Sequence, residues 1–246
     1  MNTGRPKLTL VESSSASGAL TLESVSGARP HPYATEAVFA DVTVEVLPGE
    51  TAGIWSPTIT PAIALFRALE TPARIDSGRA LLDGSPLRRG QIMLLEPLVS
   101  TDPVSVSGQF ARRISRLLDV SFRRARRLAA QHAEEFGLAE LADCDVRNLD
   151  AVSAQNVALA DAFVSVRVQR PAFVAVADPS GPATGADARD VVRTLIEYAA
   201  ASGVGAIFAS RDVALPMFAG AQYRLTPDGM WCEFAGAVPP PALRVV

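Results

Sequence analysis

The sequence predicts an α/β protein with an antiparallel β portion near its start and a helical portion in its middle. The apolar runs 173–177 and 204–209 have the length and composition of fully buried strands. They enclose a segment with apolar residues at helical spacing, and buried strands joined through a helix indicate a parallel sheet with a right-handed crossover. Two earlier segments, 20–25 and 42–47, alternate or are rich in β-branched residues, as antiparallel strands are.

The first part of the chain is predicted to be mostly strands. Residues 1–19 are rich in Ser, Gly and Thr and are expected to form a disordered tail. The turn Pro48-Gly49 separates two of the strands, and Asp83-Gly84 closes another. Trp55 ends a strand and is expected in the core. The predicted elements are strands at 20–25, 42–47, 51–55 and 79–82 and a short helix at 63–69.

The middle part is predicted to be helical. Two sets of apolar residues each fall on one helical face, and Gly137 follows the second set as a helix stop. The faces expected to be buried comprise Phe110, Ile114, Leu117 and Leu118, and then Phe122, Ala125, Ala129, Ala133 and Phe136.

Arginines cover most of the opposite faces of these helices. They are Arg112, Arg113, Arg116, Arg123, Arg124, Arg126 and Arg127. Three interpretations stay open: a solvated helix face, a docking surface for an acidic partner, or an RNA-binding surface. The RNA interpretation is the weakest, because no aromatic residues are interleaved with the arginines.

The last part is predicted to be α/β, with strands at 173–177 and 204–209. Asp187 is expected to cap the helix between them, whose buried face would carry apolar residues from Val191 to Ala199. The segments 223–226 and 230–234 flank a Pro-Asp-Gly turn and predict a hairpin. Residues 237–246 are proline-rich and are expected to form an extended tail.

Composition narrows the possible functions. The 246 residues are 48% hydrophobic and 20% charged, which allows a buried core without a disulfide framework. Cys144 and Cys232 are interpreted as packing residues in a reduced compartment. A net charge of −3 offers no global attraction for nucleic acid, and only two histidines, His31 and His132, disfavour a histidine-rich metal site. Lys7 is the only lysine, which excludes mechanisms that need a lysine inside the fold.

The order of these elements resembles the nucleotide-binding subunit of ATP-binding cassette (ABC) transporters over residues 20–236. The resemblance implies an α/β, P-loop NTPase-like fold with an antiparallel β portion and a helical subdomain at about 105–150. It also implies head-to-tail dimers that hold ATP beneath a membrane permease. The matching segments include Pro48-Gly49-Glu50, Asp76-Ser77-Gly78, Leu82-Asp83-Gly84, Phe136-Gly137-Leu138, Val157-Ala158-Leu159-Ala160, Arg170-Pro171, Asp187-Ala188-Arg189 and Ser210 to Asp212.

The phosphate (Walker A) loop of that family is not matched chemically. The loop needs glycines whose N–H groups wrap the phosphates, a lysine on the β- and γ-phosphates and a hydroxyl on Mg²⁺. The family glycines fall on Ser56, Ile59 and Pro61, the lysine on Ala62 and the hydroxyl on Ile63. The aligned positions are Ser56, Pro57, Thr58, Ile59, Thr60, Pro61, Ala62, Ile63 and Ala64.

The other family motifs are also altered. The signature aligns with Leu149, Asp150, Ala151, Val152 and Ser153, and Asp150 would repel a phosphate. The Walker B pair falls on Ala177 and Asp178. A one-residue shift would make Asp178 the magnesium ligand but leave Pro179 in place of the catalytic glutamate. The switch histidine falls on Arg211, and Glu96-Pro97 is nearest to the position of the family's Q-loop glutamine.

These substitutions predict a pseudo-ATPase that keeps the ABC fold without hydrolysis. We expect no catalytic residue, no metal site and no cofactor. The partner would be a second ABC ATPase subunit, a membrane permease, or both. No apolar run approaches the roughly 20 residues of a membrane span, so we expect a cytoplasmic chain that reaches the membrane only through a partner. Two alternatives stay open: a divergent ATPase that still binds ATP with Mg²⁺, and a free-standing ligand-binding module.

Overall fold

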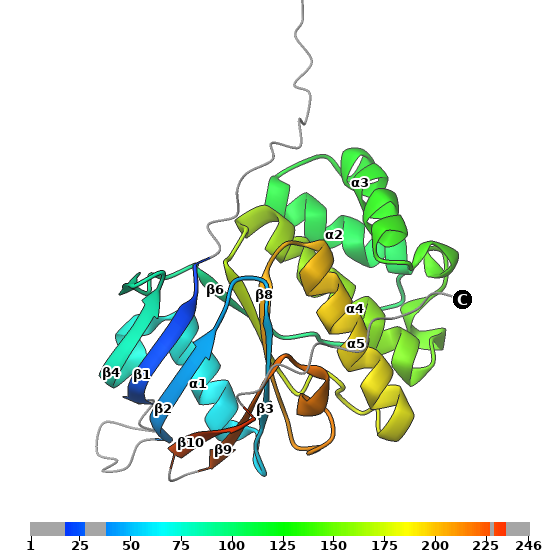
Figure 1. Ribbon diagram of the computed structural model, residues 1–246. Helices are drawn as coiled ribbons and strands as arrows, with labels where there is room; N and C mark the ends of the chain where they lie inside the picture. Colours follow the sequence, from blue (N-terminus) through cyan, green and yellow to red (C-terminus); the bar gives the residue numbers. More distant parts are fainter. Residues whose placement is uncertain (1–17, 28–37, 227–228, 235–246) are drawn as a thin grey trace, which may run out of the picture.

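The computed structural model describes residues 18–27, 38–226 and 229–234, and within them ten strands form one mixed sheet (Figure 1). The predictions for the two tails, 1–19 and 237–246, fall almost entirely outside the described residues. The strands are β1 Leu20–Gly27, β2 Phe39–Val46, β3 Thr51–Trp55, β4 Ile75–Leu82, β5 Ser85–Pro86, β6 Ile92–Leu95, β7 Phe173–Ala177, β8 Gly205–Ser210, β9 Ala221–Thr226 and β10 Gly229–Phe234.

Five α-helices and four short 3-10 helices connect these strands in the described part of the chain. The longer helices are α1 Thr60–Glu70, α2 Val106–Leu118, α3 Phe122–Glu135, α4 Ala151–Gln169 and α5 Gly185–Ala201. The 3-10 helices are η1 Pro72–Arg74, η2 Ala139–Leu141, η3 Val146–Asn148 and η4 Pro216–Phe218. Among the described residues, no helix combines the length and apolar character needed to cross a bilayer.

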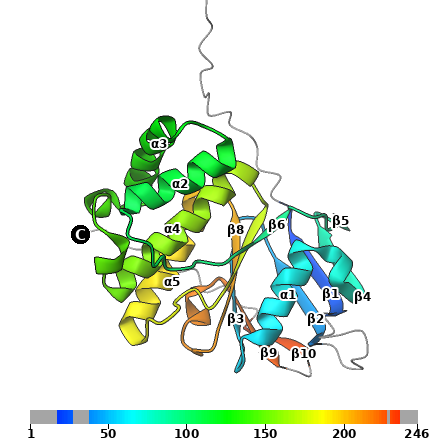
Figure 2. The same cartoon turned by 180° about the vertical axis from the view of Figure 1, so that it is seen from behind.

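The parallel half of the sheet has the order β9-β3-β8-β7-β6. Its central strands β7 and β8 are almost wholly apolar, because helices cover both faces there. In β7, Phe173 and Ala175 face the cluster formed with α1, whereas Val174 and Val176 face the cluster formed with α4 and α5. Figures 1 and 2 show α1 on one side of the sheet and α4 and α5 on the other.

The antiparallel half of the sheet consists of β5, β4, β1 and β2, with one face packed on the core. Ser24 and Asp41 have φ of 47° and lie at irregularities of the β1–β2 pairing. The β9–β10 hairpin joins the two halves, since β10 pairs with β2 and β9 pairs with β3. This mixed sheet with flanking helices confirms the predicted fold class.

Helices α2 and α3 form a pair that stands on α4, away from the antiparallel strands (Figure 1). Two residues of the predicted buried faces are exposed here, so these predictions were wrong: Leu118 is 43% exposed and Phe122 is 48% exposed. The cause is the turn between the helices. Asp119 ends α2 in the left-handed conformation, and α3 begins at Phe122, so both side chains lie at the corner of the pair.

Three further predictions were also wrong in detail. Asp187 is not the cap of α5, because the helix begins one residue after Thr184 and Asp187 lies within its first turn, where a carboxylate still favours the helix dipole. Cys144 is exposed, not packed, because it lies in the turn region between η2 and η3. Trp55 is half-buried, because it stands where β3 leaves the sheet. The short strand β6 and its apolar segment were not predicted at all.

His132 is buried where α3 meets α4. Its Nε2–H donates to the Ala160 carbonyl at 2.7 Å, and Arg167 Nη1 lies 3.4 Å from its Nδ1. The rings of Phe110 and Phe136 lie 5.1 Å and 4.4 Å away, centroid to centroid. Burial opposes protonation of this imidazole, with Arg167 adding to the effect, and lowers the pKa of His132 to about 4.

We therefore predict that acid destabilises the protein through His132. The unfolded imidazole titrates near pH 6.5, so below that pH the unfolded state binds a proton that the folded state resists. The contribution is fully present above pH 6.5, and about 3 kcal/mol should be lost as the pH falls towards 4. Urea unfolding at several pH values measures it. His132→Gln should flatten this part of the pH profile, and an unchanged profile in this variant would contradict the prediction.

Candidate functional site

The candidate site lies at the edge where the parallel strands end. Strands β3, β6, β7 and β8 all run in one direction, so the segments that follow them meet at one edge, which is where open α/β sheets bind ligands. Ser56 follows β3, Glu96 follows β6, Asp178 follows β7 and Arg211 follows β8. The structure thus brings the phosphate-loop, Walker B and switch positions of the sequence analysis to one edge. The signature positions lie at the start of α4.

The loop from Ser56 to Ile59 is engaged by the protein itself. The Ser56 side chain is buried, with its Oγ 2.7 Å from the Thr58 carbonyl and 3.1 Å from the Leu225 carbonyl. Its backbone N–H donates to the Ser210 carbonyl at 3.0 Å. Pro57 and Pro61 have no N–H to offer. The loop therefore presents few of the donors with which a phosphate cradle is built.

The residue at the family's lysine position lies in the core. Ala62 is fully buried in the apolar cluster beneath α1, together with Leu65 and Phe66. A longer, charged side chain at this position would have to enter that cluster. The nearest arginine on the helix, Arg67, forms an ion pair with Glu96 at 3.3 Å. Its guanidinium therefore already has a carboxylate partner.

An ion pair joins the ends of β7 and β8. Arg211 Nη2 lies 2.9 Å from Asp178 Oδ2. Asp178 has a φ of 53°, a left-handed conformation that is uncommon outside glycine, and its N–H donates to the Ala209 carbonyl at 2.8 Å. The carboxylate at the Walker B position and the cation at the switch position are thus partners of each other, not free groups.

Trp55 extends this network to β3. Its Nε1–H donates to the Arg211 carbonyl at 3.2 Å, and the guanidinium of Arg224 lies 4.6 Å from the centre of its ring. The end of β3 is thereby tied to the segment after β8. Trp55 is the side chain best placed to report a change at this edge, because its indole contacts the switch position directly.

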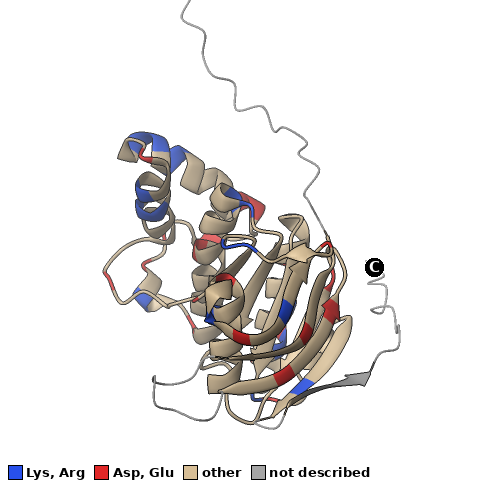
Figure 3. Ribbon diagram, turned by 90° about the vertical axis from the view of Figure 1, so that its left-hand side faces the viewer, with Lys and Arg blue, Asp and Glu red and all other residues tan. Residues whose placement is uncertain are grey.

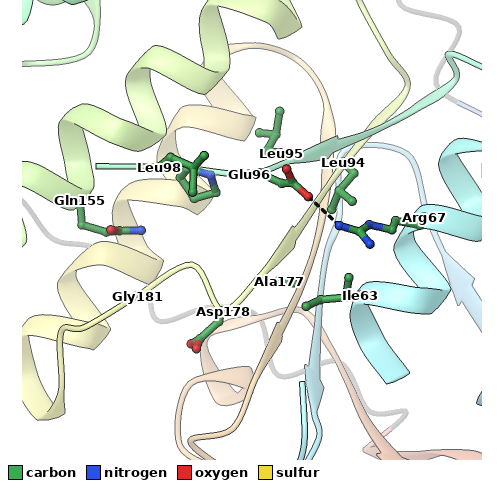
Figure 4. Close-up of a pocket in the computed structure, with 11 residues that line it drawn as sticks. Ile63, Arg67, Leu94, Leu95, Glu96, Leu98, Gln155, Ala177, Asp178 and Gly181 are labelled. Atoms are coloured by element: carbon green, nitrogen blue, oxygen red, sulfur yellow. Dashed lines mark hydrogen bonds and ion pairs between the residues drawn. The ribbon is translucent and has the colours of Figure 1, made fainter. Parts of the chain in front are cut away.

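A cavity of about 360 Å³ lies between α1, the segment after β6, the start of α4 and the end of β7 (Figure 4). A second cavity, of about 320 Å³, lies on the other side of Asp178, against the start of α5. The first is lined by Ile63, Arg67, Leu94, Leu95, Glu96, Pro97, Leu98, Gln155, Ala177, Asp178 and Gly181. Its walls are largely apolar, and the Arg67–Glu96 ion pair crosses one side of it (Figure 4).

Gln155 is a residue of this site that the sequence analysis missed. It is 2% exposed, and its Nε2 donates to the Pro179 carbonyl at 2.8 Å. Gly181 has a φ of 55°, and a Cβ there would come within 2.9 Å of Gln155 Oε1. The amide therefore holds the segment after β7 against α4. A polar residue among the buried positions 155–166 is the signal that could have revealed it.

The signature position Asp150 serves as the cap of α4. Its Oδ1 accepts the Ser153 N–H at 2.9 Å, and its Oδ2 accepts the Ser153 hydroxyl at 2.9 Å. These hydrogen bonds from Ser153 lower the pKa of Asp150, so it carries a full negative charge at neutral pH. Ala151, Val152 and Ser153 form the first turn of α4 behind this carboxylate. The start of α4 therefore presents an anion where the resemblance would place a phosphate.

Comparisons with known proteins identify the fold. No family model and no curated protein matches the chain by sequence. Among solved structures, the chain is similar to CbiO1 from Clostridium perfringens, part of the ABC transporter complex CbiONQ, with 16% identity, a TM-score of 0.69 and 87% of each chain covered. It is also similar to a nucleotide-free ATP-binding cassette from an ABC transporter, with 13% identity, a TM-score of 0.65 and coverages of 87% and 89%.

A third similar structure is a dimeric ATP-binding cassette bound to ADP and Pi in a post-hydrolysis state. It shares 14% identity and a TM-score of 0.66, and the match covers 89% of this chain and 99% of that one. At these low sequence identities, the similarity establishes the fold alone. The chain therefore has the fold of an ABC nucleotide-binding domain.

The residues at this edge do not fit the Mg²⁺–ATP that the fold implies. The lysine position is a buried alanine, two prolines remove N–H donors, and Asp178 is held by Arg211. Among the described residues, no group of three or more His, Cys, Asp or Glu side chains is arranged to hold a metal ion. The positions where a lysine, N–H donors and a free carboxylate would bind phosphate or Mg²⁺ thus hold an apolar residue, prolines and a carboxylate that already has a partner.

We predict that Gln155→Leu destabilises the fold by about 1–3 kcal/mol, because the Pro179 carbonyl loses its donor in a buried place. The free energy of unfolding in urea measures the loss. Gln169→Leu is the matched control, since it makes the same change at an exposed position of the same helix. Equal effects of the two variants would show that the amide does not hold this segment.

Proposed function

We propose that this protein is a degenerate nucleotide-binding subunit of an ABC transporter. It would lack ATPase activity and act as a structural or regulatory partner of an active ATPase or of a membrane permease. The observation that carries the proposal is the ion pair between Asp178 and Arg211. It joins the two positions where the family has a catalytic carboxylate and a switch histidine.

The chemistry of ATP hydrolysis supports the proposal that activity is lost. Phosphoryl transfer depends almost wholly on positioning and on neutralising the charge of the phosphates. In this chain Arg67, the first arginine after the loop in the sequence, pairs with Glu96, and Asp178 pairs with Arg211. Removal of a single such electrostatic group can cost a factor of roughly 10²–10³ in rate, and here several are replaced together.

The proposed partners are inferred from the assemblies to which similar structures belong. CbiO1 belongs to a transporter complex, and another similar cassette is a dimer. The buried strands and amphipathic helices form two continuous apolar clusters, which supports a role for the chain as a folded binding partner. We infer association with a motif-complete ATPase subunit, a permease, or both, at the cytoplasmic face of a membrane. Because Asp150 would repel a bridging phosphate, the association should not depend on ATP.

We predict that the purified chain neither binds nor hydrolyses ATP above background. In a Trp231→Phe variant, Trp55 is the remaining tryptophan, and its contact with Arg211 makes its fluorescence a probe of this edge. Because we expect no ATP to bind, the fluorescence should not change when Mg²⁺–ATP is added. Phosphate release should equal that of the buffer. Saturable quenching of Trp55, or turnover abolished by Asp178→Ala, would refute the proposal of an inactive subunit.

Restoring the lysine alone should not restore binding. Ala62→Lys places an ammonium group in the apolar cluster beneath α1 and leaves Pro61 in the loop, so it should lower stability without giving ATP affinity. Ile63→Lys is the matched control. It adds the same ammonium group at the neighbouring position, which lines the cavity and is not fully buried. ATP binding by Ala62→Lys would show that the alignment of the loop is wrong.

We predict that the chain assembles with its partner without nucleotide. Native co-purification followed by mass spectrometry identifies the partner, with ATP present in one arm and a chelator in the other. A motif-complete ATPase or a permease should be recovered equally in both arms. Recovery only with Mg²⁺–ATP would contradict the mechanism, and a monomer in every arm would contradict the partnership.

A further inference from the structure

The first half of α3 carries four exposed arginines, Arg123, Arg124, Arg126 and Arg127. None of them forms an ion pair within the described residues, although eight other arginines do. Figure 3 shows several basic residues gathered on the helical pair, whereas the basic and acidic residues of the sheet are interspersed. The positive charge is therefore local on a chain whose net charge is −3.

The placement of these arginines is unfavourable for the helix itself. The start of a helix is the positive end of its dipole and favours acidic side chains, yet the first turn of α3 contains none. Ser121, the residue before the helix, makes no capping hydrogen bond with its side chain. Glu134 and Glu135 lie at the opposite end, where the dipole disfavours them. Glu135 pairs with Arg167, but no such contact accounts for the four arginines at the start of the helix.

Two exposed apolar side chains adjoin the arginines. Leu118 ends α2 and Phe122 begins α3, and they are 43% and 48% exposed at the turn between the helices. We call the six residues Leu118, Phe122, Arg123, Arg124, Arg126 and Arg127 the α3 patch. It combines fixed positive charge with a leucine and a phenylalanine at a protruding corner of the molecule (Figure 1).

We propose that the α3 patch binds the surface of an anionic phospholipid bilayer. Arginine forms bidentate hydrogen bonds with phosphate, and the attraction of basic side chains to anionic lipids is a local effect that a net negative chain can retain. Leu118 and Phe122 would enter the boundary between headgroups and acyl chains, as apolar residues of interfacial helices do. The patch would give the chain its own contact with the membrane, besides any contact through a partner.

The same features disfavour other occupants. The two cavities described above lie at the edge of the sheet and include no residue of α3, so neither provides a groove for an acidic peptide there. Cytoplasmic loops of membrane proteins carry an excess of Lys and Arg and would be repelled by the patch. RNA binding usually requires several aromatic residues to stack on bases, and Phe122 is the only one in the patch. The inference does not depend on the proposed function.

Co-sedimentation of the full chain with lipid vesicles tests the inference. Vesicles of phosphatidylglycerol mixed with phosphatidylcholine should bind the chain, vesicles of phosphatidylcholine alone should not, and added salt should weaken binding. The double variant Arg123→Gln/Arg127→Gln should bind about 25-fold more weakly, from about fivefold for each arginine. Arg88→Gln/Arg89→Gln is the matched control, because it removes two exposed arginines far from α3, and it should bind as the original chain does.

A second pair of variants tests the apolar part. Phe122→Ser should weaken binding several-fold, whereas Val213→Ser, at another exposed apolar residue, should not. The thermal midpoint of the double arginine variant should stay the same or rise, because positive charge leaves the helix start.

Three results would overturn the proposal. The first is equal binding to charged and neutral vesicles or to neither. The second is an equal loss in the α3 variants and their controls. The third is binding of a single-stranded RNA homopolymer through these arginines without binding to vesicles.

Discussion

The parallel pairing of β3, β7 and β8 is the constraint on which the rest of the structure depends. Strands that run in one direction end at one edge, and their backbone groups are satisfied only if the strands pair in register, Thr51 with Ala206 and Val174 with Ala206. Both faces of these strands are covered, so most of their residues are apolar. The segments that follow the strands consequently meet, whatever residues they contain.

This constraint fixes where the segments after the strands lie but not which residues they contain. The groups that bind phosphate in a nucleotide-binding cassette lie in the segments after the strands and not in the strands. Ala62, at the start of α1, belongs to the apolar core, and Ile63 beside it lines the cavity. Asp178 and Arg211, which follow β7 and β8, form an ion pair with each other. The edge is thereby held by internal contacts where a ligand would otherwise bridge the strands.

The helical pair α2–α3 is a separate case, because its position depends on α4 and not on the sheet. The ion pair between Arg113 and Asp161, at 2.7 Å, and the buried His132 link the pair to α4. Asp161 is only 12% exposed, so its carboxylate requires a cationic partner. On the outer side, Arg112 of α2 pairs with Asp102, whereas the four arginines of the α3 patch form no ion pair within the described residues. These four side chains do not contribute to the packing on α4.

The sequence by itself determined the fold class and most of the elements. Buried strands such as Phe173–Ala177 read directly as continuous apolar runs, since both of their faces need apolar side chains. It also determined that lysine chemistry is excluded from the fold. The edge strand β6 was not recognisable, because four apolar residues between loops carry too little periodicity.

Only the tertiary structure decided how the individual side chains are used. Helical periodicity assigned Leu118 and Phe122 to buried faces, but the turn between α2 and α3 places them at a corner beyond the reach of α4. The pairing of Asp178 with Arg211 and the hydrogen bond from Gln155 to Pro179 join residues 33 and 24 positions apart in the chain. Such contacts follow from where strands and helices meet, and local sequence patterns do not contain that information.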